Sequence, residues 1–379
     1  MTQLPATWPS RRTTGALRAT GPAHVDSGEM RAALEISRRW AREGKEVAAA
    51  TLVSIGGSTP RRAGARLIVS SGGDTWGSVS FGCVEADVAA HAGAVLDSGQ
   101  PRLATYGVTD EDAFAVGFTC GGTMEVFIEP WTTLHDRLGG VPDEDFLGAM
   151  ATVMSGPGAG NHGLFNREGR LVAGSVSPVA AEALAPDVGA AADDEQARLL
   201  KCDGTRVFVE PVVPSPRLIV FGAGHTARAL TAAAAAVGFR VTVSDHRPAV
   251  AVPDRYPEAA EVVLGWPDEV VPVVAPDAGT YVVCLAHNPE VEDILLPLAL
   301  ASETRYVGVL GSRRTHAARI DRLIAAGVPE EQVARLHSPV GLDLGAVTPE
   351  EVAASIVAEL IRERRRRSRD AQDGGATGA

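Results

Sequence analysis

The chain has 379 residues, of which 45% are hydrophobic, and at roughly 150 residues per domain this length suggests two or three domains. Its formal charge of −12 makes broad attraction to nucleic acid or to an anionic membrane surface unexpected. No apolar run approaches the roughly 18 residues that span a bilayer, and the first residues lack the apolar core of a signal peptide. We therefore expect a cytoplasmic protein without a membrane span.

The first part of the chain alternates strand and helix patterns. Residues 1–26 lack periodicity and predict a flexible arm. From Ser27 the apolar spacing predicts an amphipathic helix, and residues 47–55 predict a buried strand. Two short β-like runs around a glycine turn then predict a hairpin, which a helix over residues 84–96 follows. We expect a mixed α/β N-terminal domain.

Two later strands of this domain share a signature. The runs at residues 124–130 and 205–211 both end in Val-Phe-X-Glu-Pro. We expect these two strands to pair in one N-terminal sheet. The proline-rich segment 212–216 then predicts a linker, because successive prolines stiffen and expose a chain. The N-terminal domain is therefore expected to cover residues 27–211.

The last part predicts a Rossmann-like domain. Residues 217–245 read as strand, glycine turn, helix and strand, and three further strand patterns separated by helical stretches follow. Alternating strands and helices imply a parallel sheet, so the fold class is α/β. The capping-box sequence at residues 348–351 predicts the start of a final helix. We place this domain at residues 217–367 and a disordered tail at 368–379.

The turn after the strand at 217–221 carries a dinucleotide-binding fingerprint. Gly222 and Gly224 match G-x-G-x-x-G/A directly after a strand and at the start of a helix. The glycines allow a pyrophosphate to approach the helix N-terminus, and Asp245 is placed to accept from a ribose hydroxyl. The alternative is a Rossmann fold that no longer binds a ligand.

Two histidines are further candidates in this domain. His225 lies on the first turn of the helix, where it could donate to a phosphate or stay a neutral surface side chain. His287 follows a strand, and carboxyl ends of parallel strands are where α/β folds bind ligands. We expect His287 at the rim of the crevice, together with its neighbours Asn288, Glu292 and Asp293.

A second glycine turn combines anion-binding groups. Gly311, Ser312, Arg313 and Arg314 follow a strand and precede a helix. Guanidinium groups match phosphate geometry, so this turn predicts an anion contact. The alternative is a surface salt-bridge pair.

Four scattered cysteines, without a C-x-x-C motif, fit a reducing compartment better than a disulfide framework. Cys83 lies at a predicted helix start, where the helix dipole favours a thiolate, and Cys120 is followed by two glycines. Free cysteines are more often small buried side chains, which is the competing interpretation for both. Cys202 lacks such a context, and Cys284 is expected in a strand core.

Several long segments resemble a known family. GSTPRRAGARLIV, GSVSFGCVEADV and FTCGGTMEVFIEP are similar to the N-terminal domain of the xanthine dehydrogenase accessory proteins, the XdhC/CoxI family. VFGAGHTARAL, YVGVLGSRRTHAARI and RLHSPVGLDLGAVTPEEVAASIVAEL resemble its C-terminal Rossmann domain. The resemblance covers roughly residues 30–367, with the segments in the same order.

The resemblance implies a maturation factor for molybdenum hydroxylases such as xanthine dehydrogenase or carbon monoxide dehydrogenase. Such a factor binds the molybdenum cofactor, as molybdopterin or its dinucleotide, protects it during sulfuration by a cysteine desulfurase, and delivers it to the apoenzyme. We also expect a homo-oligomer. The residues to which the cofactor-binding role is carried over are Cys83, Cys120, Gly222, Gly224, His225, Asp245, His287, Gly311, Ser312, Arg313 and Arg314. Cys83 is also the candidate contact to molybdenum or its sulfido ligand.

The chain departs from the family pattern at two points. Phe81-Gly82-Cys83 stands where the family commonly has Gly-Gly-Cys, and Asp245-His246-Arg247 stands in place of Asp-Asp-Arg. These departures bear on cofactor handling at Cys83 and on the polarity of the nucleotide crevice. The alternatives are an NAD(P)-dependent oxidoreductase, which the fingerprint would serve equally well, and a structural adaptor with an empty Rossmann domain.

Overall fold

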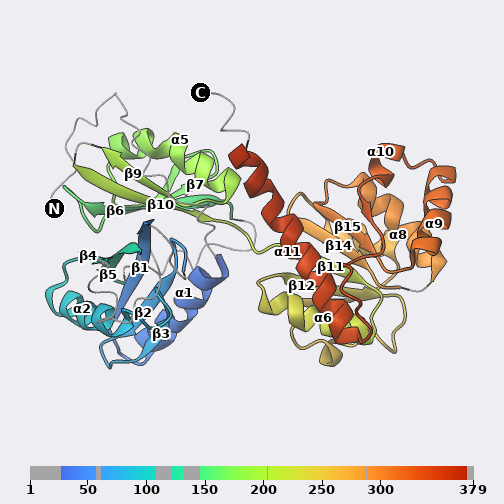
Figure 1. Cartoon of the computed structure of the whole chain (residues 1–379), viewed down its shortest axis with the longest axis horizontal. Helices are drawn as coiled ribbons and strands as arrows, with labels where there is room; N and C mark the ends of the chain where they lie inside the picture. Colours follow the sequence, from blue (N-terminus) through green and yellow to red (C-terminus); the bar gives the residue numbers. More distant parts are fainter. Residues whose placement is uncertain are drawn as a thin grey trace. The chain divides into compact units, whose positions relative to one another are not determined.

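The computed structural model forms two compact units, residues 1–214 and 215–379 (Figure 1). The residues described are 27–56, 61–107, 122–131, 146–202, 204–286 and 288–373. The boundary between the units falls inside the proline-rich segment 212–216. The arm expected at residues 1–26 lies outside the described residues. Each unit is described by itself below.

The first described element of the N-terminal unit is helix α1 (Ser27–Arg42), and the first of two five-stranded sheets follows it. The neighbour order in this sheet is β3-β2-β1-β5-β4, and all of its pairings are antiparallel. Its elements are β1 (Val47–Gly56), β2 (Arg66–Ser70), β3 (Thr75–Gly77), α2 (Glu85–Ser98), β4 (Arg102–Gly107) and β5 (Thr123–Pro130).

The second sheet repeats this plan. Its order is β8-β7-β6-β10-β9, again antiparallel, with one helix between the third and fourth strands. The elements are β6 (Gly148–Ser155), β7 (His162–Asn166), β8 (Leu171–Gly174), α5 (Pro178–Asp194), β9 (Arg198–Cys202) and β10 (Thr205–Val212). Strands β6 to β10 therefore correspond to β1 to β5, and the unit consists of two structural repeats.

Sequence details support this correspondence. The tetrapeptide Gly-Ser-Val-Ser begins at Gly77 in the first repeat and at Gly174 in the second. Both glycines have positive φ, and an added Cβ would lie 2.3 Å from the Arg66 carbonyl oxygen at Gly77 and 2.2 Å from that of His162 at Gly174. Arg66 and His162, the first residues of β2 and β7, therefore occupy equivalent positions.

The repeat corrects one sequence prediction. The two Val-Phe-X-Glu-Pro strands, β5 and β10, do not pair, because each belongs to its own sheet. They share a signature because they are the same strand of two repeats. Side chains alternate between the two faces of each strand, and both faces are buried. Val126 and Ile128 pack in the cluster with α2, whereas Phe127 and Phe208 share one cluster between the sheets.

Two buried ion pairs connect the repeats in a reciprocal way. Glu210 of β10 accepts from Arg66 of β2 at 2.5 Å, and Glu129 of β5 lies 2.7 Å from Nε2 of His162 of β7. All four side chains are at most 4% exposed. Burial by itself opposes the charged form of His162, but the Glu129 carboxylate outweighs it and raises the pKa. In each pair the fifth strand of one repeat supplies the acid, and the second strand of the other repeat supplies its partner.

The C-terminal unit contains one parallel sheet of six strands, in the order β13-β12-β11-β14-β15-β16. In chain order this is 3-2-1-4-5-6, the order of dinucleotide-binding Rossmann folds, with its switch point between β11 and β14. The strands are β11 (Arg217–Phe221), β12 (Arg240–Asp245), β13 (Glu261–Leu264), β14 (Thr280–Cys284), β15 (Tyr306–Val309) and β16 (Leu336–His337).

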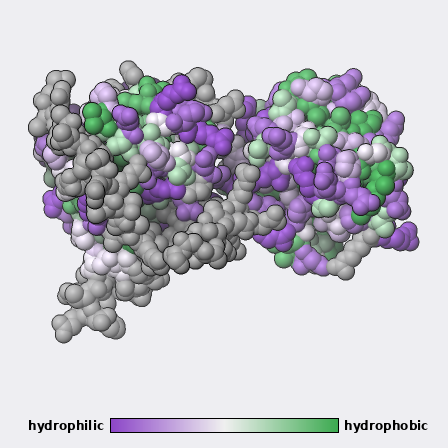
Figure 2. Space-filling model, turned by 90° about the horizontal axis from the view of Figure 1, so that it is seen from above, coloured by the Kyte–Doolittle hydropathy of each residue, from purple (hydrophilic) through white to green (hydrophobic). Residues whose placement is uncertain are grey.

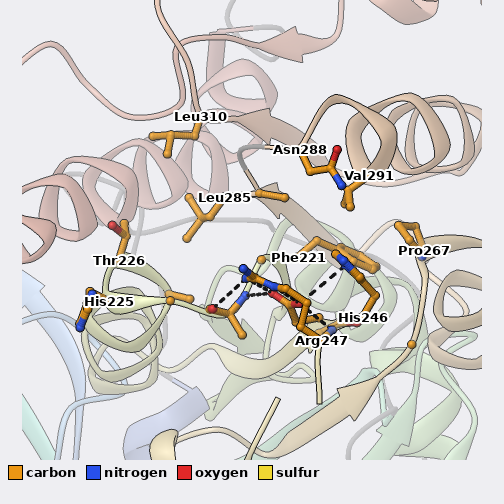
Figure 3. Close-up of a pocket in the computed structure, with 18 of the residues that line it drawn as sticks. Phe221, His225, Thr226, His246, Arg247, Pro267, Leu285, Asn288, Val291 and Leu310 are labelled. Atoms are coloured by element: carbon orange, nitrogen blue, oxygen red, sulfur yellow. Dashed lines mark hydrogen bonds and ion pairs between the residues drawn. The ribbon is translucent and has the colours of Figure 1, made fainter. Parts of the chain in front are cut away.

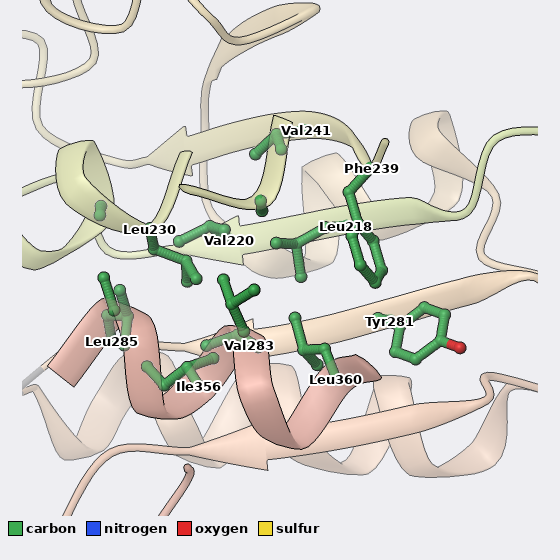
Figure 4. Packing of buried hydrophobic residues seen from close by; sticks show 14 of the residues in the cluster. Leu218, Val220, Leu230, Phe239, Val241, Tyr281, Val283, Leu285, Ile356 and Leu360 are labelled. Carbon is green, nitrogen blue, oxygen red and sulfur yellow. The ribbon is translucent and has the colours of Figure 1, made fainter. Parts of the chain in front are cut away.

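Helices cover both faces of this sheet. One face carries α6 (His225–Ala236) and α11 (Pro349–Asp373), and Leu230, Ile356 and Leu360 pack there against strand residues (Figure 4). The other face is covered by α7 (Pro267–Val274), α8 (Pro289–Ala301), α9 (Arg313–Ala325) and α10 (Glu330–Val333). A short 3-10 helix, η1 (Pro253–Arg255), precedes β13.

The capping box predicted for the last helix is present. Glu351 N donates to the Thr348 hydroxyl at 3.2 Å, and Thr348 N donates to the Glu351 carboxylate at 3.0 Å. The helix runs to Asp373, past residue 367 where the sequence predicted the end of the domain. Residues 368–373 are therefore helical, and the rest of the expected tail lies outside the described residues.

The predicted fold class is confirmed: antiparallel sheets with helices in the N-terminal unit and a parallel Rossmann sheet in the C-terminal unit. On the face seen in Figure 2, the C-terminal unit is mostly hydrophilic, with hydrophobic side chains in scattered patches. Among the described helices, none combines the length and the apolar character that crossing a bilayer requires.

We predict that Glu210→Gln destabilises the N-terminal unit by about 3–5 kcal/mol, because it leaves Arg66 buried without its counter-charge. The free energy of unfolding, measured by chemical denaturation at pH 7, tests this. Asp193→Asn is the control, since it breaks a pair with Arg167 in which both side chains are more than half exposed, and should cost about 1 kcal/mol or less. Equal stability of the two variants would contradict the prediction.

Candidate functional site

The glycine turn after β11 has the geometry that a bound phosphate requires. Gly222 has φ +104°, and an added Cβ would lie 2.5 Å from the backbone nitrogen of Ala286, so only glycine fits. Gly224 is the N-cap of α6 and faces open space, with nothing within 4 Å of an added Cβ. The first N–H groups of α6 have no partner within the helix, so they are available to an anion.

Asp245, at the end of β12, holds this turn. Its Oδ2 accepts from Ala223 N and from Nη2 of Arg247, both at 2.8 Å. Its Oδ1 accepts from the backbone N and from Nε of Arg247, both at 2.9 Å. Burial opposes ionisation of Asp245, but the hydrogen bonds from Arg247 and Ala223 outweigh it and lower the pKa. Asp245 is therefore a charged, buried group that positions its neighbours.

A cavity of about 510 Å³ lies at the carboxyl ends of the strands on both sides of the switch point. This volume is within the range of small-ligand sites, roughly 300–1,000 Å³. Figure 3 shows Leu310 and Asn288 on one side of the cavity and His246 and Arg247 on the other. Within the described chain, the lining residues come from the ends of β11 and β12, from the turns after β11 to β15, and from the starts of helices α6, α7, α8 and α11.

Two residues that the sequence analysis did not select line this cavity. Arg247 has a side chain that is 56% exposed, and His246 stacks its ring on Trp266 at 4.2 Å between centroids. The signal for both was their place directly after Asp245. Where the resemblance implies an acid, His246 thus places an aromatic ring at the cavity.

The second glycine turn lies beyond the cavity as the described residues define it. Among the described side chains the lining reaches Leu310 and does not include Gly311, Ser312 or Arg314. The Ser312 hydroxyl caps α9 by accepting from Thr315 N at 3.2 Å. An added Cβ at Gly311 would lie 2.8 Å from the Thr315 hydroxyl. Arg314 is exposed, and the side chain of Arg313 lies outside the described part.

The sequence prediction for the rim is partly wrong. Glu292 is 7% exposed and bonds to Arg319 through both of its oxygens, and Asp293 pairs with Arg322. These acids connect α8 to α9 and do not line the cavity. Asn288 does line it, while its side-chain oxygen accepts from Glu290 N and caps α8. His287 lies outside the described residues.

Cys83 lies in a loop, residues 78–84, that wraps around one carboxylate. Glu85, the first residue of α2, accepts from the backbone nitrogens of Ser80 at 2.8 Å and Gly82 at 2.7 Å and from the Ser78 hydroxyl at 2.6 Å. Burial opposes this charge, but the serine and backbone donors lower the pKa of Glu85 to about 2. The backbone N–H groups of Ser80 and Gly82, before this helix, therefore donate to the Glu85 carboxylate.

Phe81 has a backbone conformation that is typical of glycine. Its φ is +63°, in the left-handed region that disfavours side chains with a Cβ. The side chain is 67% exposed, and the guanidinium of Arg61 lies 5.2 Å from the ring centroid. The departure thus places an exposed aromatic ring two residues before Cys83.

The loop has no counterpart in the second repeat. After Gly-Ser-Val-Ser the first repeat continues through residues 81–84 before α2 begins, whereas in the second repeat Ser177 caps α5 directly. Cys83 is therefore on a segment that distinguishes the repeats. It is partly buried, against the cluster beneath α2.

The other cysteines differ from Cys83. Cys284 is fully buried in β14, as predicted, and burial raises the pKa of its thiol to about 12. Cys202 is the last residue of β9. Cys120 lies outside the described residues. Within the described part of the chain, no group of three or more His, Cys, Asp and Glu side chains is arranged to hold a metal ion.

Comparison with known proteins identifies the family. Residues 218–360 match the XdhC Rossmann domain, and residues 40–107 match the XdhC and CoxI family. Together these matches cover more than half of the chain. The chain belongs to the XdhC and CoxI family. The family's Rossmann match spans the strands, the glycine turn and the cavity described above.

Named relatives extend over most of the chain. A protein of Bacillus subtilis (strain 168) that is named as a probable xanthine dehydrogenase subunit is 29% identical over 326 residues, or 85% of this chain and 94% of that protein. The molybdenum cofactor insertion chaperone PaoD of Escherichia coli (strain K12) is 28% identical over 86% of each chain. A crystal structure described as a xanthine dehydrogenase from Bacillus halodurans has a TM-score of 0.73 at 27% identity, covering 88% of this chain and 96% of that one.

We predict that Glu85→Gln destabilises the Cys83 loop by roughly 1.5–3 kcal/mol at pH 7, because charged acceptors form the stronger hydrogen bonds. A carboxyl with a lowered pKa stabilises the fold above its ordinary pKa, and this contribution is lost as the pH falls toward 2. The difference from the unsubstituted protein should therefore shrink between pH 4.5 and pH 2. Chemical denaturation at several pH values tests this, with the exposed Glu182→Gln as control. A difference that is independent of pH would refute it.

Proposed function

We propose that this protein is a maturation factor that binds the molybdenum cofactor, holds it during sulfuration and delivers it to a molybdenum hydroxylase. The names of its relatives support the general role, since one is a molybdenum cofactor insertion chaperone and another is named for xanthine dehydrogenase. Xanthine dehydrogenase and carbon monoxide dehydrogenase are the classes of client. The proposed partners are the apoenzyme and a cysteine desulfurase, and we propose a homo-oligomer.

The observation that carries the proposal is the cavity of the C-terminal unit. It combines the N-terminus of α6 with the guanidinium of Arg247, and both attract a phosphate. Molybdopterin bears a phosphate, and its dinucleotide form bears a pyrophosphate. The cavity volume of about 510 Å³ suits the phosphate-bearing part of either form. In this role Gly222, Gly224 and Arg247 bind the anion, and Asp245 orients Arg247.

Cys83, in the N-terminal unit, is proposed separately as a contact to molybdenum or to its sulfido ligand. A bound cofactor supplies a metal held by soft dithiolene sulfur, for which a thiolate is a suitable neighbour. Cys83 is partly exposed and lies on the loop that only the first repeat contains. Cys120 is proposed to act with it. Functional residues are often placed on loops that a rigid scaffold positions. Here the Glu85 carboxylate fixes the loop by accepting hydrogen bonds from its backbone N–H groups.

The alternative, an NAD(P)-dependent oxidoreductase, rests on the same cavity. Hydride transfer to a substrate requires a positioned acid or base beside the nicotinamide. The acid of the cavity wall, Asp245, already accepts hydrogen bonds from Arg247 and from Ala223 N, so its oxygens are not free to act as a base. Titration of the purified protein with NADH, NADPH and the pterin cofactor separates the two functions. Binding of a nicotinamide cofactor without binding of the pterin would favour the oxidoreductase.

We predict that Gly224→Asp abolishes cofactor binding and leaves the fold intact. The residue has an extended backbone and open space around its Cα, so the new carboxylate would fill and charge the cavity. The measurement is the molybdenum and oxidised pterin retained by protein isolated from a molybdenum-replete host. Gly93→Asp, at an exposed position of α2 with nothing within 4 Å of an added Cβ, is the matched control. Undiminished retention by Gly224→Asp would place the ligand elsewhere.

We further predict that Cys83→Ser lowers cofactor retention and activation of the client together, with little change in stability. The substitution removes a soft donor and hardly changes the volume. Each variant, loaded with cofactor, is assayed for activation of molybdenum-free apoenzyme. Cys284→Ser is the control, and it should lose only stability, by about 1–3 kcal/mol, because it places a hydroxyl in a strand core. Full activation by Cys83→Ser would return Cys83 to the role of a small buried side chain.

A further inference from the structure

The carboxylate at the end of β12 has no acceptor capacity left for a ligand. A carboxylate has about four acceptor sites. Oδ1 of Asp245 accepts hydrogen bonds from the backbone N and Nε of Arg247. Oδ2 accepts from Ala223 N and from Nη2 of Arg247, and all four distances are 2.8–2.9 Å. In NAD-binding Rossmann folds the acid at this position accepts from the ribose hydroxyls. Here a ribose hydroxyl would first have to displace Arg247.

Arg247 presents the donors that Asp245 does not use. A guanidinium has five N–H groups. Nε and Nη2 are directed to Asp245, and Nη2 also approaches the Ala223 carbonyl oxygen at 3.5 Å. The Nη1 edge points away from this pair, and the side chain lines the cavity with 56% of its surface exposed. Because Asp245 already fixes the side chain, little rotamer freedom is lost when Nη1 binds a ligand.

The rest of the cavity wall favours an anion. Among the described lining residues Asp245 is the only acid, and Arg247 compensates its charge. The neighbouring His246 stacks on Trp266, so its ring is held at the wall without adding negative charge. Glu269 of the adjacent helix accepts from Trp266 N at 2.9 Å and is not part of the lining.

We infer that the β12 end of this cavity binds a phosphate monoester through the Nη1 edge of Arg247, and that it selects against ligands that offer only ribose hydroxyls there. The inference rests on the proposed function in that it concerns the same cavity. Two ligands carry this chemistry: an adenine nucleotide with a 2′-phosphate, and a pterin with a phosphate monoester. Arg247 is thus the residue that determines specificity.

The test compares pairs of ligands that differ by one phosphate. Adenosine 2′,5′-bisphosphate and adenosine 5′-monophosphate are titrated calorimetrically into the full chain, as are an oxidised pterin phosphate and its phosphatase-treated form. We expect at least one phosphate-bearing ligand to bind about 10-fold or more tightly than its partner, the effect of a charged hydrogen bond. Preference within the adenosine pair or the pterin pair identifies the source of the phosphate.

Arg247→Ala should change the adenosine pair in opposite directions. Affinity for the 2′-phosphate falls, because its partner is lost and the Asp245 carboxylate repels it. Affinity for adenosine 5′-monophosphate is kept or rises, because Asp245 can then accept from the ribose. In the pterin pair the preference for the phosphate disappears. A misfolded variant would lose every ligand. Arg255→Ala, at an exposed arginine outside the lining, should behave as the unsubstituted chain.

The inference is overturned if neither phosphate-bearing ligand is preferred, or if Arg247→Ala leaves the preference unchanged. These outcomes are distinct from failure of the proposed function. Retention of molybdenum and pterin without dependence on Arg247 would keep the proposed function and refute the inference. Preference for adenosine 2′,5′-bisphosphate in a protein that retains no pterin would keep the inference and refute the proposed function.

Discussion

The geometry of the cavity depends on the Asp245 carboxylate. Asp245 is buried at the end of β12, yet it reaches the turn after β11 through Ala223 N and its own loop through Arg247. Because a buried charge is stable only when it is paired and hydrogen-bonded, these contacts are mutually required. The glycine turn, the end of β12 and the Arg247 guanidinium are therefore linked to one another at the cavity wall. A ligand that enters the cavity meets hydrogen-bond donors that are already in place.

The local elements of this assembly could be predicted from the sequence. A strand, a glycine pair and a helix follow each other within a few residues, and their order fixes where the helix N-terminus lies. The direction of side chains could not be predicted in the same way. Glu292 lies in the first turn of α8, which Asn288 caps, but its side chain turns toward Arg319, a partner that is distant in sequence. For the same reason Arg247 was missed: its place in the cavity depends on the ion pair with Asp245.

The N-terminal unit shows the same limit at the level of strands. Val-Phe-X-Glu-Pro identifies two strands correctly, but a shared signature does not say whether the strands are neighbours or copies. The phenylalanines and glutamates of both strands face the other repeat, where Glu129 meets His162 and Glu210 meets Arg66. Two buried acids with partners in the opposite repeat require both sheets to be present, because either acid alone would be left without its counter-charge. These ion pairs join residues that are far apart in the sequence, so they cannot be predicted from its composition or periodicity.

The two repeats differ where chemistry is expected. The repeated scaffold provides two helix starts, and Ser177 caps α5 directly, whereas residues 81–84 precede α2 and carry the Cys83 thiol. The backbone N–H groups of this loop already donate to Glu85, so the positive end of α2 is compensated and does not favour a second anion there. A soft metal attracts a thiolate without help from a helix. The proposed role of Cys83 therefore depends on the metal of the cofactor, and the loop contributes by holding the thiol in place.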